Sequence, residues 1–335
     1  MEKRILVVTN QADLHANVVI ERLKAKGAQP FRVNLDEFPA QFRVTLALTD
    51  GRWKGVIEDM SREDVLDISS VGAIWLRKPA PFNFPSKDMA VQETAFARAE
   101  MKQIFLGMLY SRKCHWVSHP AAIRAAIWKA EQLMRAASLG FEVPSSIVTN
   151  SLSFAQAFRT SADSGMIFKA LSSPLLAADK VGSKQRIASG LATTLITDDD
   201  EDALDSIREL PCFFQHHIPK QFDLRVTVIG RRVFAARIHS QADERTRIDF
   251  RDYTAEVPYE AADLPREVER RCVEFVHSYQ LHFGVLDLIL TPQGKYVFLE
   301  NNPVGQFLFV EELVPSLTIT DALAEDLVTG AAAWS

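Results

Sequence analysis

The 335-residue sequence has few cysteines, no long hydrophobic run and no excess of positive charge. Cys114, Cys212 and Cys272 lie far apart, so neither a disulfide framework nor a CxxC metal or redox pair is expected. No run of about 18 apolar residues would span a membrane, and the apolar run at 5–8 is too short for a signal peptide. The net charge of −5 argues against nucleic-acid binding. We therefore expect a cytoplasmic protein with no nucleic-acid or membrane partner.

Several familiar catalytic motifs are also missing. The sequence contains no GxxxxGK[ST] phosphate loop and no HExxH metal motif. The first strand-to-helix turn reads Thr9-Asn10-Gln11, where a dinucleotide fingerprint needs glycines. No nucleophile elbow supports a serine hydrolase. His216-His217 is a tempting metal pair, but neighbours on a strand point to opposite faces, which disfavours it.

What is present is an alternation of strand-like and helix-like segments, which is typical of an α/β protein. With 335 residues and 47% hydrophobic composition, the chain exceeds what one core usually holds, which favours two or three lobes over one. The first lobe, residues 1–117, opens with a strand, a helix at about 13–26 and a second strand, as in a Rossmann-like doubly wound domain. Residues 118–213 are predicted to form the central lobe, and residues 214–335 the C-terminal lobe.

The central and C-terminal lobes combine helices with short strands. Pro120 is well placed in the first turn of a helix that runs to about Leu139. The acidic run at 198–202 is expected to open a second helix, because carboxylates favour a helix N-terminus. Two antiparallel hairpins are predicted in the last third of the chain, one around Gly230 and one around 291–294.

The most informative residues lie in the second of these hairpins. Asp287 is in the middle of an apolar strand, where a carboxylate is costly unless it is paired, hydrogen-bonded or bound to metal. The partner strand ends in Glu300-Asn301-Asn302, and alternation puts Glu300 and Asn302 on one face. Oxygen-bearing side chains on adjacent strands are the ligands that Mg²⁺ prefers. The alternative is that Asn301-Asn302-Pro303 forms a turn and Asp287 pairs with a buried arginine.

Basic residues are available to complement such a site. Lys129 lies in the helix after Pro120, and Lys169 ends an apolar strand. Arg225 and Arg237 lie on the two strands of the hairpin around Gly230. Beside an acidic cation site, these side chains are expected to neutralise a triphosphate. The set is typical of phosphate transfer, which depends on charge neutralisation and alignment rather than on a protein nucleophile.

Taken together, these residues resemble the ATP-grasp superfamily, and within it the graspetide (microviridin-type) peptide macrocyclases. The matching segments are residues 214–220, 223–228, 233–236, 240–241, 246–251 and 299–307. The resemblance is dense over residues 118–310 and one of general layout in the N-terminal lobe. It implies an α+β ATP-grasp fold, in which two lobes clamp ATP and a Rossmann-like pre-ATP-grasp lobe precedes them.

The resemblance also implies a role for each candidate residue. The implied nucleotide-binding residues are Lys129, Lys169, Gln215, His217, Ile218 and Asp223. The implied catalytic residues are Arg225 and Arg237, which would stabilise the transferring γ-phosphate. The implied ligands of two magnesium ions are Asp287, Glu300 and Asn302.

The reaction implied by the resemblance is that of an ADP-forming ligase. Asp or Glu side chains of a ribosomal precursor peptide would become acyl phosphates, and Ser, Thr or Lys side chains would close ester or amide macrocycles. A leader segment of the peptide would bind around residues 175–210, and the enzyme would be a homodimer. Two alternatives stay open: a ligase that adds free amino acids to a small molecule or protein C-terminus, and a nucleotide-binding partner protein that has lost catalysis.

Overall fold

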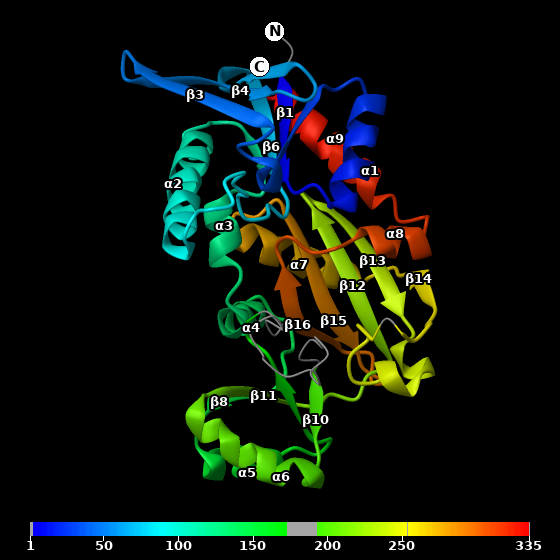
Figure 1. The fold of residues 1–335 in the computed structure, drawn as a ribbon. Helices are drawn as coiled ribbons and strands as arrows, with labels where there is room; N and C mark the ends of the chain where they lie inside the picture. The colour runs from blue at the N-terminus through cyan, green and yellow to red at the C-terminus, as the bar shows by residue number, and fades with distance from the viewer. Residues whose placement is uncertain (1–2, 173–192, 253, 335) are drawn as a thin grey trace.

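The computed structural model describes residues 3–172, 193–252 and 254–334. Figure 1 shows a parallel sheet with its helices at the top, a long antiparallel sheet in the middle and a small sheet at the bottom. This mixture of parallel and antiparallel sheets with packed helices confirms the α/β class expected from the sequence. Among the described residues, no helix is both long and apolar enough to cross a membrane.

The first lobe is built on a four-stranded parallel sheet in the order β2-β1-β6-β7. Its strands are β1 (Arg4–Thr9), β2 (Pro30–Asn34), β6 (Val71–Leu76) and β7 (His115–Val117). The helices that pack on this sheet are α1 (Leu14–Ala25), α2 (Val91–Tyr110) and α9 (Ile319–Ala332). A separate antiparallel sheet consists of β3 (Phe42–Thr49), β4 (Arg52–Asp59) and β5 (Asp64–Asp67). The doubly wound opening expected for this lobe is therefore present.

The last helix returns to the first lobe. Leu323 and Leu327 of α9 lie in one buried cluster with Val7 of β1 and Trp75 of β6. Both chain ends consequently lie in the upper part of the molecule (Figure 1). The predicted domain boundaries at 117/118 and 213/214 stay a prediction, and the packing of α9 adds a contact between the first lobe and the end of the chain.

A histidine–carboxylate cluster fixes α9 to the other elements. Asp326 of α9 accepts hydrogen bonds from His115 Nε2 of β7 at 2.8 Å and from His282 Nε2 at 2.7 Å. Burial acts to raise the pKa of Asp326, but the hydrogen bonds from both histidines outweigh it and lower this pKa to about 2. Because the pKa is lower than in an unfolded chain, this carboxylate stabilises the fold above pH ~4, and the contribution is lost as pH falls towards 2.

We expect Asp326→Asn to lower the free energy of unfolding by about 2 kcal/mol at pH 7. The difference between variant and wild type should shrink below pH ~4, because the wild-type carboxyl group then becomes protonated. Urea unfolding of both proteins at pH 7 and near pH 3 measures this, with the exposed Asp263→Asn as the matched control. A difference that is the same at both pH values would contradict the assignment.

The central lobe is a small antiparallel sheet in the order β10-β9-β11-β8. Its strands are β8 (Ser146–Thr149), β9 (Met166–Lys169), β10 (Thr194–Ile196) and β11 (Cys212–His216). Helices α5 (Leu152–Thr160) and α6 (Glu201–Leu204) accompany it at the bottom of Figure 1. The acidic run at 198–202 opens helical structure as expected, although α6 is short and 3₁₀ turns flank it.

The single helix predicted from Pro120 to Leu139 is wrong. Two helices, α3 (Pro120–Ala125) and α4 (Lys129–Ser138), replace it. The chain between them is extended at Trp128, and the freed carbonyl of Ala126 accepts a hydrogen bond from Gln132 Nε2 at 2.6 Å. This break makes Lys129 the first residue of α4.

The C-terminal lobe is an antiparallel sheet in the order β14-β13-β12-β15-β16. Its strands are β12 (Phe222–Ile229), β13 (Arg232–Ile238), β14 (Tyr259–Ala261), β15 (Phe283–Leu290) and β16 (Tyr296–Asn302). Both predicted hairpins, β12–β13 and β15–β16, are confirmed. Helix α7 (Arg266–Ser278) buries Cys272, Phe275 and Val276 against one face of the sheet, and the short helix α8 (Leu308–Leu313) follows β16. The other face carries polar residues, next to apolar residues that pack with α9.

Candidate active site

A pocket lies between the central lobe and the polar face of the C-terminal sheet. Its empty volume is about 580 Å³. The walls come from β9 and β11 on one side and from β12, β15, β16 and the loop at 248–251 on the other. Predicted site residues that line it are Lys169, Gln215, His217, Ile218, Asp223, Asp287 and Glu300. Most of the residues selected from the sequence are thus brought to one place.

The two candidate metal-binding carboxylates face each other across the hairpin. Asp287 of β15 is the direct partner of Glu300 on β16, so both side chains point to the same face. The register shifts between Asp287 and Leu288. Asn302 is the last residue of β16, and its carbonyl and Oδ1 accept hydrogen bonds from the backbone N–H groups of Gly305 and Val304, so a turn starts directly after it. It lines a neighbouring hollow together with Lys129 and Glu300. The expected approach of the two carboxylates is confirmed.

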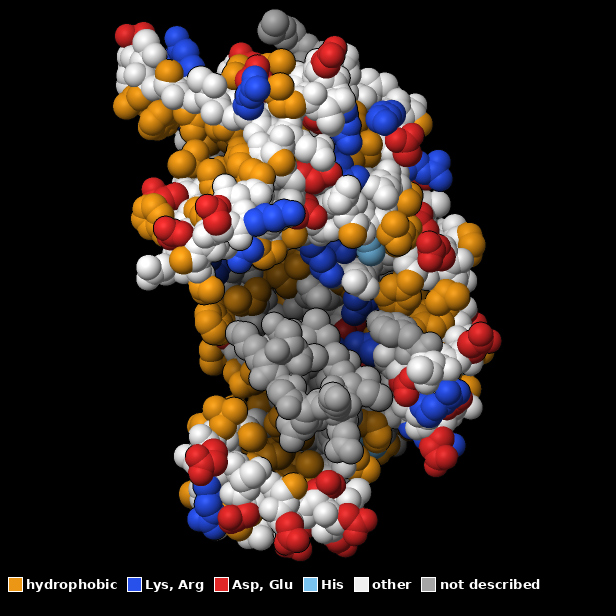
Figure 2. Space-filling view, in the orientation of Figure 1, with side chains coloured by type: hydrophobic (Ala, Val, Ile, Leu, Met, Phe, Trp, Pro, Cys, Tyr) orange, Lys and Arg blue, Asp and Glu red, His pale blue; other side chains and the backbone are white. Residues whose placement is uncertain are grey.

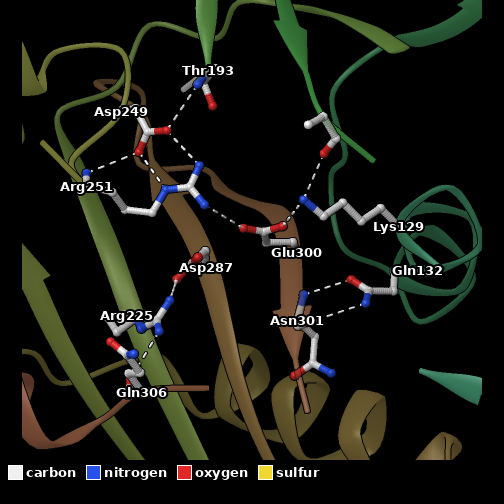
Figure 3. Close-up of polar contacts among 11 residues, drawn as sticks. Lys129, Gln132, Thr193, Arg225, Asp249, Arg251, Asp287, Glu300, Asn301 and Gln306 are labelled. Atoms are coloured by element: carbon white, nitrogen blue, oxygen red, sulfur yellow. Dashed lines mark hydrogen bonds and ion pairs between the residues drawn. The ribbon is translucent and has the colours of Figure 1, made fainter. Parts of the chain in front are cut away.

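Asp287 also meets the buried arginine that was considered as the alternative. Arg225 Nη1 donates to Asp287 Oδ1 at 2.7 Å, and Arg225 Nη2 donates to the carbonyl of Gln306 at 3.1 Å (Figure 3). Burial raises the pKa of Asp287 and the charge of Glu300 adds to this, while Arg225 opposes both. Arg225 therefore supplies the charge that keeps a buried carboxylate paired in this state of the protein.

Glu300 is surrounded by cations. Lys129 Nζ lies 3.0 Å from Glu300 Oε2, and Arg251 Nη1 lies 3.4 Å from Glu300 Oε1 (Figure 3). Burial acts to raise the pKa of Glu300, but the charges of Lys169, Lys129 and Arg251 outweigh it and lower this pKa to about 2. Glu300 is therefore ionised at neutral pH, as a metal ligand must be.

The two lysines that lower the pKa of Glu300 come from different elements. Lys129, at the start of α4, also donates to the carbonyl of Ala170 at 3.0 Å, just beyond the end of β9. Lys169, the last residue of β9, is buried, and burial lowers the pKa of its ammonium group. Two cations that converge on one buried anion leave a site that favours a second anion, such as a phosphate group.

The residues implied for adenine recognition line the same pocket. Gln215 Nε2 donates to Ser146 Oγ at 3.0 Å, whereas Gln215 Oε1 is buried and has no hydrogen-bond partner among the described residues. The backbone N–H of His217 donates to the carbonyl of Gly165 at 2.8 Å, which aligns the His217-Ile218 segment along the pocket. An unsatisfied buried oxygen fits an amino group of a ligand, because such an acceptor is costly to leave empty.

Asp223 and Arg237 differ in how they relate to this pocket. Asp223 lines it and is paired with Lys220 at 2.6 Å; burial raises its pKa and Lys220 opposes the rise. Arg237 pairs with Leu224, whereas Arg225 pairs with Ala236, so the two arginines point to opposite faces of the sheet. Arg237 contacts Glu260 at 2.8 Å instead. The structure does not bring Arg237 together with the other candidates.

Two residues of the site were not selected from the sequence. Arg251 binds Asp249 through two hydrogen bonds, of 2.6 and 2.8 Å, and then reaches Glu300 (Figure 3). Gln132 of α4 donates to the Asn301 carbonyl at 2.9 Å and accepts from the Asn301 N–H at 2.8 Å. Gln132 could have been found from its position, since it is a polar residue one helical turn after Lys129. Arg251 lies in a loop without periodicity, so only the family resemblance of its segment pointed to it.

The contacts of Gln132 lead to a stability prediction. We expect Gln132→Met, which keeps the side-chain length, to lower the free energy of unfolding by about 2 kcal/mol, because it leaves buried backbone groups of Asn301 and Ala126 unsatisfied. Urea unfolding measures the loss. The exposed Gln103→Met on α2 is the matched control and should change stability by less than about 0.5 kcal/mol. Equal stability of the two variants would contradict the role of Gln132.

Comparison with known proteins defines the class. Residues 4–124 match the family model described as the MvdD pre-ATP grasp domain. The macrocyclase MdnC from Microcystis aeruginosa MRC, bound with precursor peptide MdnA, is 29% identical with a TM-score of 0.83 and coverage of 97% of this chain and 99% of that chain. A RiPP-associated ATP-grasp ligase from Chryseobacterium gregarium, in complex with ADP and a leader and core peptide, is 25% identical with a TM-score of 0.87 and coverage of 98% and 97%.

A third solved structure is the ATP-grasp ligase PsnB complexed with minimal precursor, Mg and ADP, at 25% identity, a TM-score of 0.74 and coverage of 98% of this chain and 97% of that chain. No curated protein matches the sequence. The fold and the site thus define a ligase of the ATP-grasp superfamily. Within that superfamily the chain is similar to RiPP-associated ligases, the macrocyclases MdnC and MdnB among them.

Proposed function

We propose that the chain uses ATP to convert Asp or Glu side chains of a ribosomal precursor peptide into acyl phosphates and closes ester or amide macrocycles with Ser, Thr or Lys side chains. The observation that carries the proposal is the carboxylate pair Asp287–Glu300, which lysines and arginines surround. Such a set has the charge and the ligand types for a triphosphate and its metal. The peptide complexes of MdnC and of the Chryseobacterium gregarium ligase support a peptide substrate.

For the nucleotide, we propose that adenine binds between β11 and the C-terminal sheet. The unpartnered Gln215 Oε1 and the backbone at His217-Ile218 would receive its polar edge. Ile167 and Leu299, which line opposite walls, would contact its faces. Asp223 with its partner Lys220 would close the pocket beside the sugar.

For the phosphates, we propose that Lys129 and Lys169 bind oxygens of the triphosphate and that Arg251 adds to them. Asp287, Glu300 and Asn302 fit Mg²⁺, because the buried Asp287 lies directly opposite the half-buried Glu300 and Asn302 offers an amide oxygen two residues after Glu300 on β16. When bound, Mg²⁺ would neutralise phosphate charge and align the γ-phosphoryl group. Two ions are proposed, and the PsnB complex with Mg and ADP supports the metal.

The proposed reaction forms ADP. A carboxylate oxygen of the peptide attacks the γ-phosphorus, and the bond to the bridging oxygen of ADP breaks. A hydroxyl or amino group then attacks the acyl carbon and loses its proton to solvent, while phosphate leaves with the former carboxylate oxygen. Each linkage therefore removes one water from the peptide as ATP becomes ADP and phosphate. Arg225 would stabilise the charge of the transferring group; a contribution of Arg237 stays a prediction that the described contacts do not support.

Two alternatives share parts of this site. A ligase of free amino acids would use the same activation, but the relatives in complex with precursor peptides favour the macrocyclase. A partner protein without catalysis is disfavoured, because Asp287 and Glu300 are retained in a geometry suited to a metal. We further propose a cytoplasmic homodimer. The leader-binding segment expected around 175–210 lies, from 175 to 192, outside the described residues.

Incubation with ATP, Mg²⁺ and a panel of microviridin-type precursor peptides, MdnA among them, tests the proposal by mass spectrometry. Loss of one water per linkage, matched by one ADP, is the expected result. A gain of mass by an amino-acid residue would establish the free-amino-acid ligase instead. Binding of ATP without formation of ADP, and without a change in any peptide, would contradict the proposed reaction.

A further inference from the structure

A second hollow lies beneath the first lobe, at the carboxyl ends of β1 and β6. Its empty volume is about 780 Å³, and it faces the chain that follows β16. Figure 2 shows Lys and Arg side chains gathered along the hollow below the first lobe. The lining residues used below are Asp13, His15, Arg77, Lys78 and Gln306. Neither the nucleotide nor the metal in the proposed function uses this hollow.

Arg77 is a buried cation with spare donors. Its side chain is 2% exposed, and its Nη1 donates to the carbonyl of Val304. Asp13 Oδ2 lies 4.0 Å from Arg77 Nε, a distance that allows a charge interaction but no hydrogen bond. Nε and Nη2 of Arg77 are buried and have no hydrogen-bond partner within the described ranges. Unsatisfied donors on a buried guanidinium are costly, so they indicate an anionic ligand with two oxygens.

Lys78 brings a second cation to the same hollow. Burial lowers the pKa of its ammonium group, and the charge of Arg77 adds to this. Asp13 and Glu312 are the carboxylates that line the hollow beside these cations. Asp13 is already engaged, since it accepts from Thr9 Oγ1 at 2.5 Å and from the backbone of His15 at 3.1 Å. Space for another anion therefore remains beside Arg77 and Lys78.

The hollow leads to the proposed phosphate-transfer site. Gln306 lines it, and the Gln306 carbonyl accepts from Arg225 Nη2 at 3.1 Å. The ring of Phe309, also in the lining, lies 5.9 Å from the Arg225 guanidinium. A carboxylate held by Arg77 would thus be adjacent to the arginine that is paired with Asp287.

The walls of the hollow are fixed before any ligand binds. His15 Nε2 accepts hydrogen bonds from the backbone N–H groups of Phe307 at 3.2 Å and Leu308 at 3.3 Å. Burial lowers the pKa of His15 to about 4, so the ring is neutral and keeps this acceptor at neutral pH. The first lobe and the chain after β16 are consequently held together around Arg77, which favours a preorganised anion site.

We propose that Arg77 and Lys78 of the first lobe bind the side-chain carboxylate of the acceptor peptide and present it to the phosphate-transfer site at Arg225. This inference rests on the proposed function and adds the residues that would hold its substrate. The guanidinium offers a two-point contact to the carboxylate, and the ammonium group adds a second charge. A peptide whose glutamate is replaced by glutamine would lose both.

The test uses a minimal probe with one carboxylate, N-acetyl-L-glutamate α-amide, because the natural peptide is unidentified. ADP formation by the full chain is measured against probe concentration for wild type, Arg77→Lys and Lys78→Met, with the exposed Lys113→Met as control. We expect the KM for the probe to rise about tenfold or more in both variants, with affinity for ADP and Mg²⁺ unchanged. The amide analogue, N-acetyl-L-glutamine amide, should not stimulate ADP formation.

Thermal unfolding shows whether a variant fails to fold. If Arg77→Lys does not fold, the KM of Lys78→Met decides the test, because this substitution retains the backbone contacts of residue 78. Unchanged KM values in the folded variants would overturn the assignment while leaving the proposed function intact. A wild-type protein that binds ADP and Mg²⁺ but shows no saturable response to the probe would overturn it as well. Failure of the wild type to bind ADP and Mg²⁺ would contradict the proposed function and this inference together.

Discussion

Replacing Glu300 by glutamine should lower the rate of ADP formation by about 10³-fold while the protein stays folded. The change keeps the volume of the side chain but removes the charge on which Lys129, Lys169 and Arg251 converge. It would also remove a proposed Mg²⁺ ligand. ADP formation with a precursor peptide and circular dichroism measure the two parts of this prediction. Because the pKa of Glu300 is about 2, lowering the pH to 5 should not reproduce the effect.

The control for this variant is Glu100→Gln, on the exposed surface of α2. It makes the same chemical change far from the pocket and should leave the rate within about twofold, as surface substitutions usually do. If Glu300→Gln retained the wild-type rate, the carboxylate pair would have no part in catalysis. Comparable losses in both variants would point to a general effect on the fold.

Replacing Arg225 by lysine should lower kcat by about 10²-fold and change the affinity for ATP much less. Arg225 holds Asp287 with one nitrogen and the Gln306 carbonyl with another, and a single ammonium group does not span both. The charge is retained, so the variant isolates geometry from charge. Single-turnover ADP formation gives the rate, and equilibrium binding of an ATP analogue gives the affinity.

The matched control is Arg231→Lys, at the exposed turn between β12 and β13. It should have wild-type kinetics. A loss of ATP affinity equal to the loss of rate in Arg225→Lys would place Arg225 in ground-state binding and not in the transfer step. An unchanged rate would remove Arg225 from the reaction altogether.

The regular register of β15 with β16 would pair Asp287 with Leu299, and a one-residue shift at Asp287 brings it opposite Glu300 instead. The hairpin itself, and with it the approach of these two segments, could be predicted from the sequence. The face of the sheet on which Arg237 lies could not be predicted, because it depends on the length of the turn between β12 and β13. A two-residue turn pairs Ile229 with Arg232, which puts Arg225 opposite Ala236 and moves Arg237 to the other face. One additional turn residue would have placed both arginines together.

Tertiary contacts explain the other differences. The break between α3 and α4 depends on Gln132, which binds the carbonyl of Ala126 and the backbone of Asn301, a residue distant in sequence. Helical periodicity does not report such a contact, so one helix was predicted where two form. The position of α9 against the first lobe depends on packing with Val7 and Trp75, which chain order does not reveal. Local patterns thus determine elements and hairpins, whereas long-range contacts complete the site.

The central claim is that a peptide carboxylate becomes an acyl phosphate. A precursor peptide with oxygen-18 in its Asp and Glu carboxylates tests this directly, when it is incubated with the enzyme, ATP and Mg²⁺. The account predicts that each phosphate released during ring closure carries one oxygen-18 atom, because the attacking carboxylate oxygen leaves with the phosphorus. Phosphate without the label, released while linkages form, would contradict activation through an acyl phosphate.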